Sequence, residues 1–193
     1  DRWVFTENMP GREISTAAAL AASARVLCGF NDTLSAHCSR IAAEIFAESL
    51  EEEARTGASD PRARFGVMER IQAAAELYRT TGEAMYFDYI LSRWDRCVQS
   101  VASCAWYLAP IEKQMQRQPK YKEQCAAFRE ALGRYRDQLD RQSAETPYGV
   151  PYRPSIWGAG WDIQSFGYRH YFLAKTYPDL FVPDQVTNAL NFI

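Results

Sequence analysis

The sequence lacks the short motifs that mark several common catalytic chemistries. It contains no His-Glu-x-x-His zinc motif, no phosphate-binding loop, no Gly-x-Ser-x-Gly nucleophile turn and no EF-hand loop. Histidine is rare, and neither His37 nor His170 has a second metal ligand three or four residues away. We therefore expect both histidines to be structural, and we predict no metal site and no cofactor.

Cysteine is also scarce, and its pattern does not indicate a disulfide framework. The five cysteines are an odd number and form no Cys-x-x-Cys pair. Most of them fall among the apolar residues of predicted helices, which favours reduced, buried side chains. Cys28 and Cys38 flank one short connection and could meet, so the cysteines leave the cellular compartment open.

The chain has neither a strong net charge nor a long apolar run. Its 193 residues carry a formal net charge of −2 without a long basic run, so we expect no nucleic-acid partner. No stretch approaches the roughly 18 consecutive apolar residues of a transmembrane helix, so we expect no membrane insertion. Asp1 leads directly into folded-looking sequence, with no signal-peptide pattern. We expect either that a signal has been removed or that the chain begins within a larger protein.

What the sequence does contain is helical periodicity, clearest over residues 121–142. Its apolar positions are separated alternately by four and three residues, as one face of an α-helix requires. They are Tyr121, Cys125, Phe128, Leu132, Tyr135 and Leu139. Further helices are predicted over residues 14–28, 32–53, 61–80, 83–93, 95–108, 161–176 and 183–190. No alternating apolar and polar run predicts a strand.

Two kinds of predicted helix alternate along the chain. Segment 14–28 is apolar nearly all round, which predicts burial on most sides, whereas others have one apolar stripe. Inner and outer layers of helices would produce this alternation. We therefore predict an all-α fold, either an α/α toroid or barrel or an α-solenoid, although no fixed-period repeat is present. The acidic run Glu51–Glu53 is expected on a solvated helix face.

Residues 146–161 interrupt the helices. Three prolines and three glycines within this stretch forbid a regular helix. Four aromatic residues lie among them: Tyr148, Tyr152, Trp157 and Trp161. Flat rings on a loop fixed by prolines could form a platform for a sugar ring. They could equally pin a long connection to the core, and residue chemistry alone leaves both interpretations open.

Carboxylates are plentiful but scattered. An inverting glycoside hydrolase needs two, one to protonate the leaving oxygen and one to activate water. We find no such pair on a loop. Glu7, Glu83 and Asp162 lie at loops or helix starts, where caps or favourable charges at helix N-termini explain them more simply. By residue chemistry alone, the chain has a binding platform without a catalytic pair.

Several segments resemble the catalytic domains of glycoside hydrolase family 9. They are Phe5-Thr-Glu-Asn-Met-Pro-Gly-Arg-Glu, Ser15-Thr-Ala-Ala-Ala-Leu-Ala-Ala, Tyr148-Gly-Val-Pro-Tyr-Arg-Pro-Ser-Ile-Trp-Gly-Ala-Gly-Trp, Ser165-Phe-Gly-Tyr-Arg-His-Tyr-Phe-Leu-Ala-Lys-Thr-Tyr-Pro and Gln185-Val-Thr-Asn-Ala-Leu-Asn-Phe-Ile. The match is most specific at Trp157-Gly158 and in the final helix, and weak between Gly57 and Pro110. This resemblance implies an (α/α)6 barrel that hydrolyses β-1,4-glucans by inversion. It also implies a secreted, periplasmic or cell-surface location, because a polymeric substrate cannot enter a cell.

The same resemblance implies roles for residues of the loop. Trp157 matches a tryptophan that serves as a sugar-stacking platform beside the point of cleavage. Tyr148, Tyr152 and Arg153 share its loop and are predicted to line the substrate.

The catalytic residues of the family have no match in the sequence. The family's base lies in an Asp-x-Gly-Asp-like motif and its acid is a Glu after the last-helix pattern, and neither motif occurs here. We therefore expect residues 1–193 to be one partial domain, a central-to-C-terminal section of the barrel. It should be inactive alone and have two partners, a β-glucan and the remainder of its own catalytic domain.

Two rival hypotheses remain at this point. The chain could be a non-catalytic all-helical carbohydrate-binding or scaffold protein that uses the same loop without chemistry. It could also belong to another α/α-barrel enzyme that acts on different glycans.

Overall fold

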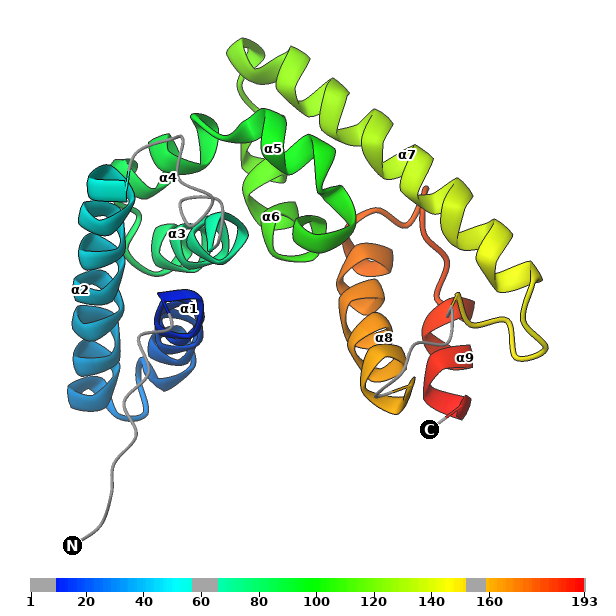
Figure 1. The fold of residues 1–193 in the computed structure, drawn as a ribbon, viewed down its shortest axis with the longest axis horizontal. Helices are drawn as coiled ribbons and strands as arrows, with labels where there is room; N and C mark the ends of the chain where they lie inside the picture. The colour runs from blue at the N-terminus through cyan, green and yellow to red at the C-terminus, as the bar shows by residue number, and fades with distance from the viewer. Residues whose placement is uncertain (1–9, 57–65, 152–158, 193) are drawn as a thin grey trace, which may run out of the picture. The chain divides into compact units, whose positions relative to one another are not determined.

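The computed structural model describes residues 10–56, 66–151 and 159–192, and within these ranges the secondary structure is helical, without strands. The chain divides into two compact units, Asp1–Arg93 and Trp94–Ile193. Figure 1 shows the helices of both units along the chain, and each unit is described by itself below. The all-α prediction is therefore confirmed for the described residues.

The described residues of the first unit form four helices. They are α1 (Pro10–Leu27), α2 (Asp32–Thr56), α3 (Val67–Thr81) and α4 (Ala84–Leu91). The helix predicted over residues 14–28 begins earlier, at Pro10, because the fixed φ of proline suits the first turn. The connection to α2 follows the predicted caps: Gly29 has a left-handed φ of 83°, and the Asn31 side chain accepts the backbone N–H of Leu34 at 3.1 Å.

Helix α1 is buried on one side rather than on most sides. It packs against α2 and α3 through small side chains, which let helices approach closely. Its buried residues include Ile14, Ala17, Ala18, Ala21 and Ala24. Val26, by contrast, is 74% exposed. The prediction of a helix buried nearly all round is wrong here, because other positions of the helix carry exposed polar side chains, among them Glu13, Ser15 and Ser23.

The end of α2 also departs from its prediction. Glu51 is exposed, but Glu53 is half-buried and pairs with Arg70 at 3.4 Å and Arg93 at 2.9 Å. The hydroxyl of Tyr89 donates to the second carboxylate oxygen of Glu53 at 3.3 Å. Because Arg70 is buried, its charge requires such a partner. A solvated acidic run is therefore the wrong interpretation for Glu53.

The described residues of the second unit form five α-helices and a short 3-10 helix. They are α5 (Trp94–Gln99), α6 (Val101–Met115), η2 (Pro119–Tyr121), α7 (Lys122–Ala144), α8 (Ala159–Thr176) and α9 (Asp184–Phe192). The helix predicted over residues 95–108 is wrong at two points. It breaks at Ser100, whose φ of −113° and ψ of 30° are not helical, and it continues past Pro110. Buried Leu108, Ala109 and Ile111 hold the helix together around this proline.

Helix α7 confirms the strongest periodic pattern. Of its six predicted core positions, five are buried and Tyr135 is partly buried. Trp94 anchors α5 to α7: its indole N–H donates to the carbonyl of Gln124 at 3.0 Å, and its ring lies 5.1 Å from that of Phe128. The cysteines are all free; Cys28 is exposed and the other four are buried.

Candidate functional site: an aromatic loop and an apolar groove

The site predicted from the sequence is the loop over residues 146–161, whose described ends belong to the second unit. Tyr152, Arg153 and Trp157 lie outside the described residues, so their predicted roles stay predictions. Tyr148 is described, and 65% of its surface is exposed. Its ring meets Phe192 of α9 edge-on, with the centroids 5.3 Å apart. One face of Tyr148 is thus available, as a sugar platform requires.

The start of the loop is fixed by a turn. The Thr146 hydroxyl donates to the carbonyl of Val150 at 2.8 Å and accepts its N–H at 3.1 Å. Gly149 has a φ of 64°, and a Cβ there would lie 2.8 Å from the amide nitrogen of Asn188. That amide donates to the carbonyl of Gly149 at 3.3 Å. The turn therefore requires glycine at 149, both for its φ and for the close approach of α9.

Apolar packing ties the same turn to the two helices that follow. Val150 is buried in a small cluster with Ile163 of α8 and Ala189 of α9, and Phe166 packs against it. The connection is therefore pinned to the core through an aliphatic side chain. Tyr148 is left outward-facing, so the pinned connection does not exclude a sugar platform, which stays a prediction.

Trp161 stands out at the far end of the loop. It lies in the first turn of α8 and is 80% exposed, although tryptophan normally buries its large apolar surface. Trp161 is one of the four aromatic residues of the stretch that could form a platform, but it was not among the residues predicted to line the substrate. The exposure of Trp161 follows from its position relative to Ile163. Ile163 lies in the same turn of α8 and points toward the Val150 cluster, so Trp161 points in another direction.

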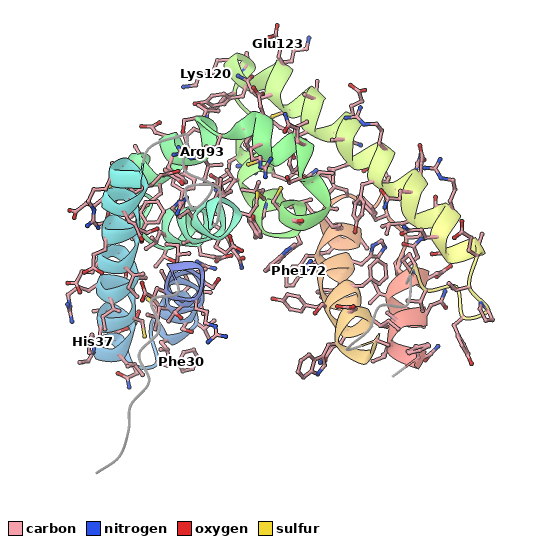
Figure 2. The ribbon with its side chains drawn as sticks, in the orientation of Figure 1. Phe30, His37, Arg93, Lys120, Glu123 and Phe172 are labelled. Atoms are coloured by element: carbon pink, nitrogen blue, oxygen red, sulfur yellow. The ribbon has the colours of Figure 1, made fainter. Side chains whose placement is uncertain are left out.

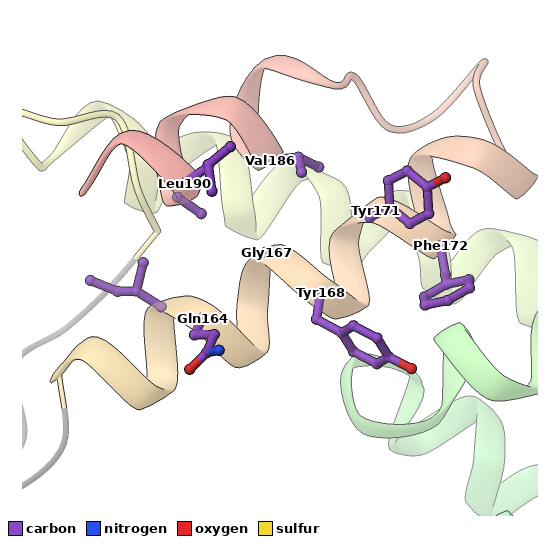
Figure 3. A pocket seen from close by; sticks show the side chains of 9 residues that line it. Gln164, Gly167, Tyr168, Tyr171, Phe172, Val186 and Leu190 are labelled. Carbon is purple, nitrogen blue, oxygen red and sulfur yellow. The ribbon is translucent and has the colours of Figure 1, made fainter. Parts of the chain in front are cut away.

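An apolar groove runs between α8 and α9 (Figure 3). Its volume is about 430 Å³, and its lining is aliphatic or aromatic apart from Gln164 and Gly167. Figure 3 shows Gln164, Tyr168, Tyr171 and Phe172 on α8 and Val186 and Leu190 on α9. Leu190 is 73% exposed. This groove was not predicted, because the apolar spacing of each helix alone does not reveal which face its neighbour leaves open.

An aromatic cluster borders the groove where α8 meets α6. The Trp106 ring lies 5.6 Å from Tyr168 and 6.4 Å from Phe172, and Tyr168 and Phe172 meet edge-on at 5.1 Å. Figure 2 shows Phe172 on α8. Edge-to-face contacts of this kind hold helices together. The cluster therefore joins α6 to α8 and leaves Tyr168 half-exposed beside the groove.

Among the described carboxylates of the second unit, Glu112 is buried and Asp162 is exposed. Glu112 of α6 is only 1% exposed; it accepts the Tyr177 hydroxyl at 2.9 Å and the Gln116 amide at 2.7 Å. Burial, together with the Glu112 carboxylate, raises the pKa of Tyr177 well above its ordinary value, and the same two causes raise that of Cys125 to about 11. Asp162 is exposed in the first turn of α8, as predicted for a charge that favours a helix N-terminus.

The two histidines lie in different environments. His37 is exposed on α2. His170 of α8 is buried: its ring stacks on Phe166 at 5.1 Å, and its Nε2 lies 3.3 Å from the carbonyl of Val182. Burial lowers the pKa of His170, because the charged imidazolium would be poorly solvated there. His170 thus has a packing role, as predicted.

No group of three His, Cys, Asp or Glu side chains within residues 10–56, 66–151 and 159–192 is arranged to hold a metal ion. No helix in these ranges has the length and apolar character needed to cross a bilayer.

Comparison with known proteins gives one match. The family model described as Glycosyl hydrolase family 9 matches residues 2–191. Neither the curated proteins nor the solved structures contain a match to the chain.

Proposed function

This chain belongs to glycosyl hydrolase family 9, and on that premise we propose that it is the section of a β-1,4-glucan hydrolase that contributes an aromatic substrate platform. The platform residues are Trp157, Tyr148, Tyr152 and Arg153. In this proposal, rings stack on the apolar faces of glucose units, and Arg153 binds their hydroxyls. The catalytic carboxylates of the inverting reaction are supplied from outside these 193 residues.

Two predictions from the sequence are confirmed by the family match. One is the resemblance itself, and the other is the fold class: all-α, as part of an (α/α)6 barrel. Membership of this family also means that the protein is a glycoside hydrolase of the cellulase type with a glucan substrate. It decides against an α/α-barrel enzyme of another family.

The observation that carries the platform proposal is the exposure of aromatic rings at both described ends of the loop. Tyr148 and Trp161 are 65% and 80% exposed, while Val150 beside them is buried and fixes the turn. Large rings that a fold keeps in water next to a rigid turn mark a binding surface. In a glucan-hydrolysing family, a sugar chain is the ligand that suits them.

The absence of a catalytic pair from the chain is proposed on chemical grounds. The sequence has no Asp-x-Gly-Asp motif. The described buried carboxylates, Glu76 and Glu112, are occupied by hydrogen bonds to neighbouring side chains. Neither is free to protonate a leaving oxygen or activate water, which the inverting mechanism requires.

The proposal includes a location and a second partner. A hydrolase of polymeric glucan acts where the polymer is, so we place the protein outside the cytoplasm: secreted, periplasmic or at the cell surface. We also propose that residues 1–193 are one partial domain of the barrel and work together with the remainder of the same catalytic domain.

Titration of the 193-residue chain with cellohexaose, followed by tryptophan fluorescence, tests the platform. Trp157→Ala should weaken binding about tenfold or more, since one ring stacked on a ligand contributes about 1.4 kcal/mol or more. Phe30→Ala is the matched control, because it removes a ring that is 91% exposed in the first unit, outside the loop. Equal affinity of Trp157→Ala and the wild type would exclude the platform. A folded chain without any response would favour a helical scaffold.

Hydrolysis of a soluble β-glucan by the same chain tests the second half of the proposal. We expect no release of reducing ends above the buffer rate, because the two carboxylates are missing. Measurable turnover that survives repurification would show that a catalytic pair lies within residues 1–193.

A further inference from the structure

The break between α5 and α6 brings two cysteines together. Cys97 lies in α5 and Cys104 in α6, on either side of the non-helical Ser100. Along an uninterrupted helix, seven residues would separate them by about 10 Å. At the break, Cys104 Sγ instead lies 3.3 Å from the carbonyl oxygen of Cys97, so the kink brings these two residues together.

Hydrogen bonding shows how closely the pair is set. The Cys104 thiol donates toward the carbonyl of Cys97 at 3.3 Å and that of Ser100 at 3.4 Å. The Cys97 thiol is also a hydrogen-bonding neighbour of the Cys104 thiol, and together with burial it raises the pKa of Cys104. Both side chains are completely buried, and both are free thiols in this structure.

We propose that Cys97 and Cys104 form a disulfide that closes the break between α5 and α6. The inference concerns the second unit by itself and does not rest on the glucanase proposal. The oxidant is a low-molecular-weight disulfide such as oxidised glutathione. A disulfide across the break would fix the angle between α5 and α6. Without it, only the packing of side chains holds this angle, because Ser100 is not helical.

The reaction is an ordinary thiol–disulfide exchange in two steps. One cysteine thiolate attacks a sulfur of oxidised glutathione, forming a mixed disulfide and releasing one glutathione thiolate. The second cysteine thiolate attacks the protein sulfur of that mixed disulfide, forming the Cys97–Cys104 bond and releasing the second glutathione. The protein loses two electrons and two protons, and both are taken up by the two molecules of glutathione.

Burial determines when this reaction is fast. The thiolate is the attacking species, and a buried thiol with a raised pKa supplies little of it. Glutathione also cannot reach a completely buried side chain. We therefore expect the bridge to form during folding, and only slowly in protein that is already folded.

A single tryptic peptide reports the bond. Cleavage after Arg96 and Lys113 gives a peptide that contains Cys97 and Cys104 and no other cysteine. The denatured 193-residue chain is refolded in a mixture of reduced and oxidised glutathione, alkylated with iodoacetamide, and digested. We expect this peptide to lack both alkyl groups and to be two hydrogen atoms lighter than its reduced form. Dithiothreitol followed by alkylation should then add two groups.

Variants separate this pair from other oxidation. In Cys104→Ala and in Cys97→Ala, the remaining thiol should be alkylated or carry glutathione. Cys125→Ala, which removes another buried cysteine of the same unit, should leave the bridge intact. The oxidised wild type should melt roughly 5 °C above the reduced form, and the Cys104→Ala variant should show no such difference.

Two results would overturn the inference. One is a refolded wild type, helical by circular dichroism, in which both Cys97 and Cys104 are alkylated. The other is a bond from either residue to a different cysteine.

Discussion

The two units bury their polar side chains in different ways. In the first unit the buried charges are ion-paired: Arg70 with Glu53, and Glu76 with Arg25 and Arg79. In the second unit, buried Glu112 accepts hydrogen bonds from a neutral hydroxyl and a neutral amide. A charge that loses an ionic partner leaves a second charge buried, whereas a lost neutral donor leaves only one unsatisfied acceptor. We therefore expect the loss of one buried polar side chain to lower the free energy of unfolding more in the first unit than in the second.

The largest effect is expected for Glu76→Ala in the first unit. Arg25 donates to the Glu76 side chain, to its backbone carbonyl at 2.8 Å and to the Thr80 hydroxyl, so α1 and α3 share one network. We expect a loss of about 2–3 kcal/mol in the free energy of unfolding, below the usual figure for a buried pair because Arg25 and Arg79 retain some contact with water.

Hydrogen exchange of peptides from α1 and α3 measures this loss. Glu44→Ala is the matched control, since Glu44 forms an exposed ion pair with Arg40 on α2. Such a pair should contribute well under about 1 kcal/mol. An equal effect of the two substitutions would contradict the role of the buried network.

A smaller effect is expected for Tyr177→Phe in the second unit. This change removes the hydroxyl that donates to Glu112 at 2.9 Å while it keeps the buried ring. The free energy of unfolding should fall by about 1–2 kcal/mol, because the Gln116 amide still satisfies part of the carboxylate. Urea denaturation measures it. Tyr148→Phe is the control, and it should hardly change the free energy of unfolding because this ring is exposed. An equal loss in the two variants would contradict a stabilising role for the buried hydrogen bond between Tyr177 and Glu112.

The smallest effect is the pH dependence that His170 gives to the second unit. Its pKa is lower in the folded state than in the unfolded chain, where it is about 6.5. Below that value the unfolded chain binds the proton more readily, so the stabilisation is complete above about pH 6.5 and is lost as pH falls toward the folded-state pKa. Asp140 of α7 opposes this shift by favouring the charged ring.

Urea midpoints between pH 7.5 and 5 measure this dependence. His170→Gln should flatten the decline between pH 6.5 and 5. His37→Gln, at an exposed histidine of the first unit, should leave it unchanged. A decline that persists in His170→Gln would assign the pH dependence to other groups.

Part of the candidate site was predictable from the sequence and part was not. The stretch that breaks the helices, and the exposure of Tyr148 within it, follow from prolines, glycines and an aromatic residue in a turn. The groove between α8 and α9 could not be predicted, because it depends on how two helices pack around Val150. For Trp161, the sequence showed that it belongs to the aromatic stretch. Its exposure could not be predicted, because it depends on which face of α8 packs against the core.

The sequence by itself determined that the protein is helical, where most helices lie and to which family it belongs. Helical spacing, capping residues and turn residues act within a few positions, so α7 and the cap at Asn31 could be predicted locally. Only the tertiary structure decided that Glu53 is paired, that α5 breaks from α6 at Ser100 and that α6 continues through Pro110. Each of these depends on partners distant in sequence, such as Arg93 for Glu53 and the packed core around Leu108. Local propensity is weak enough for such contacts to override it.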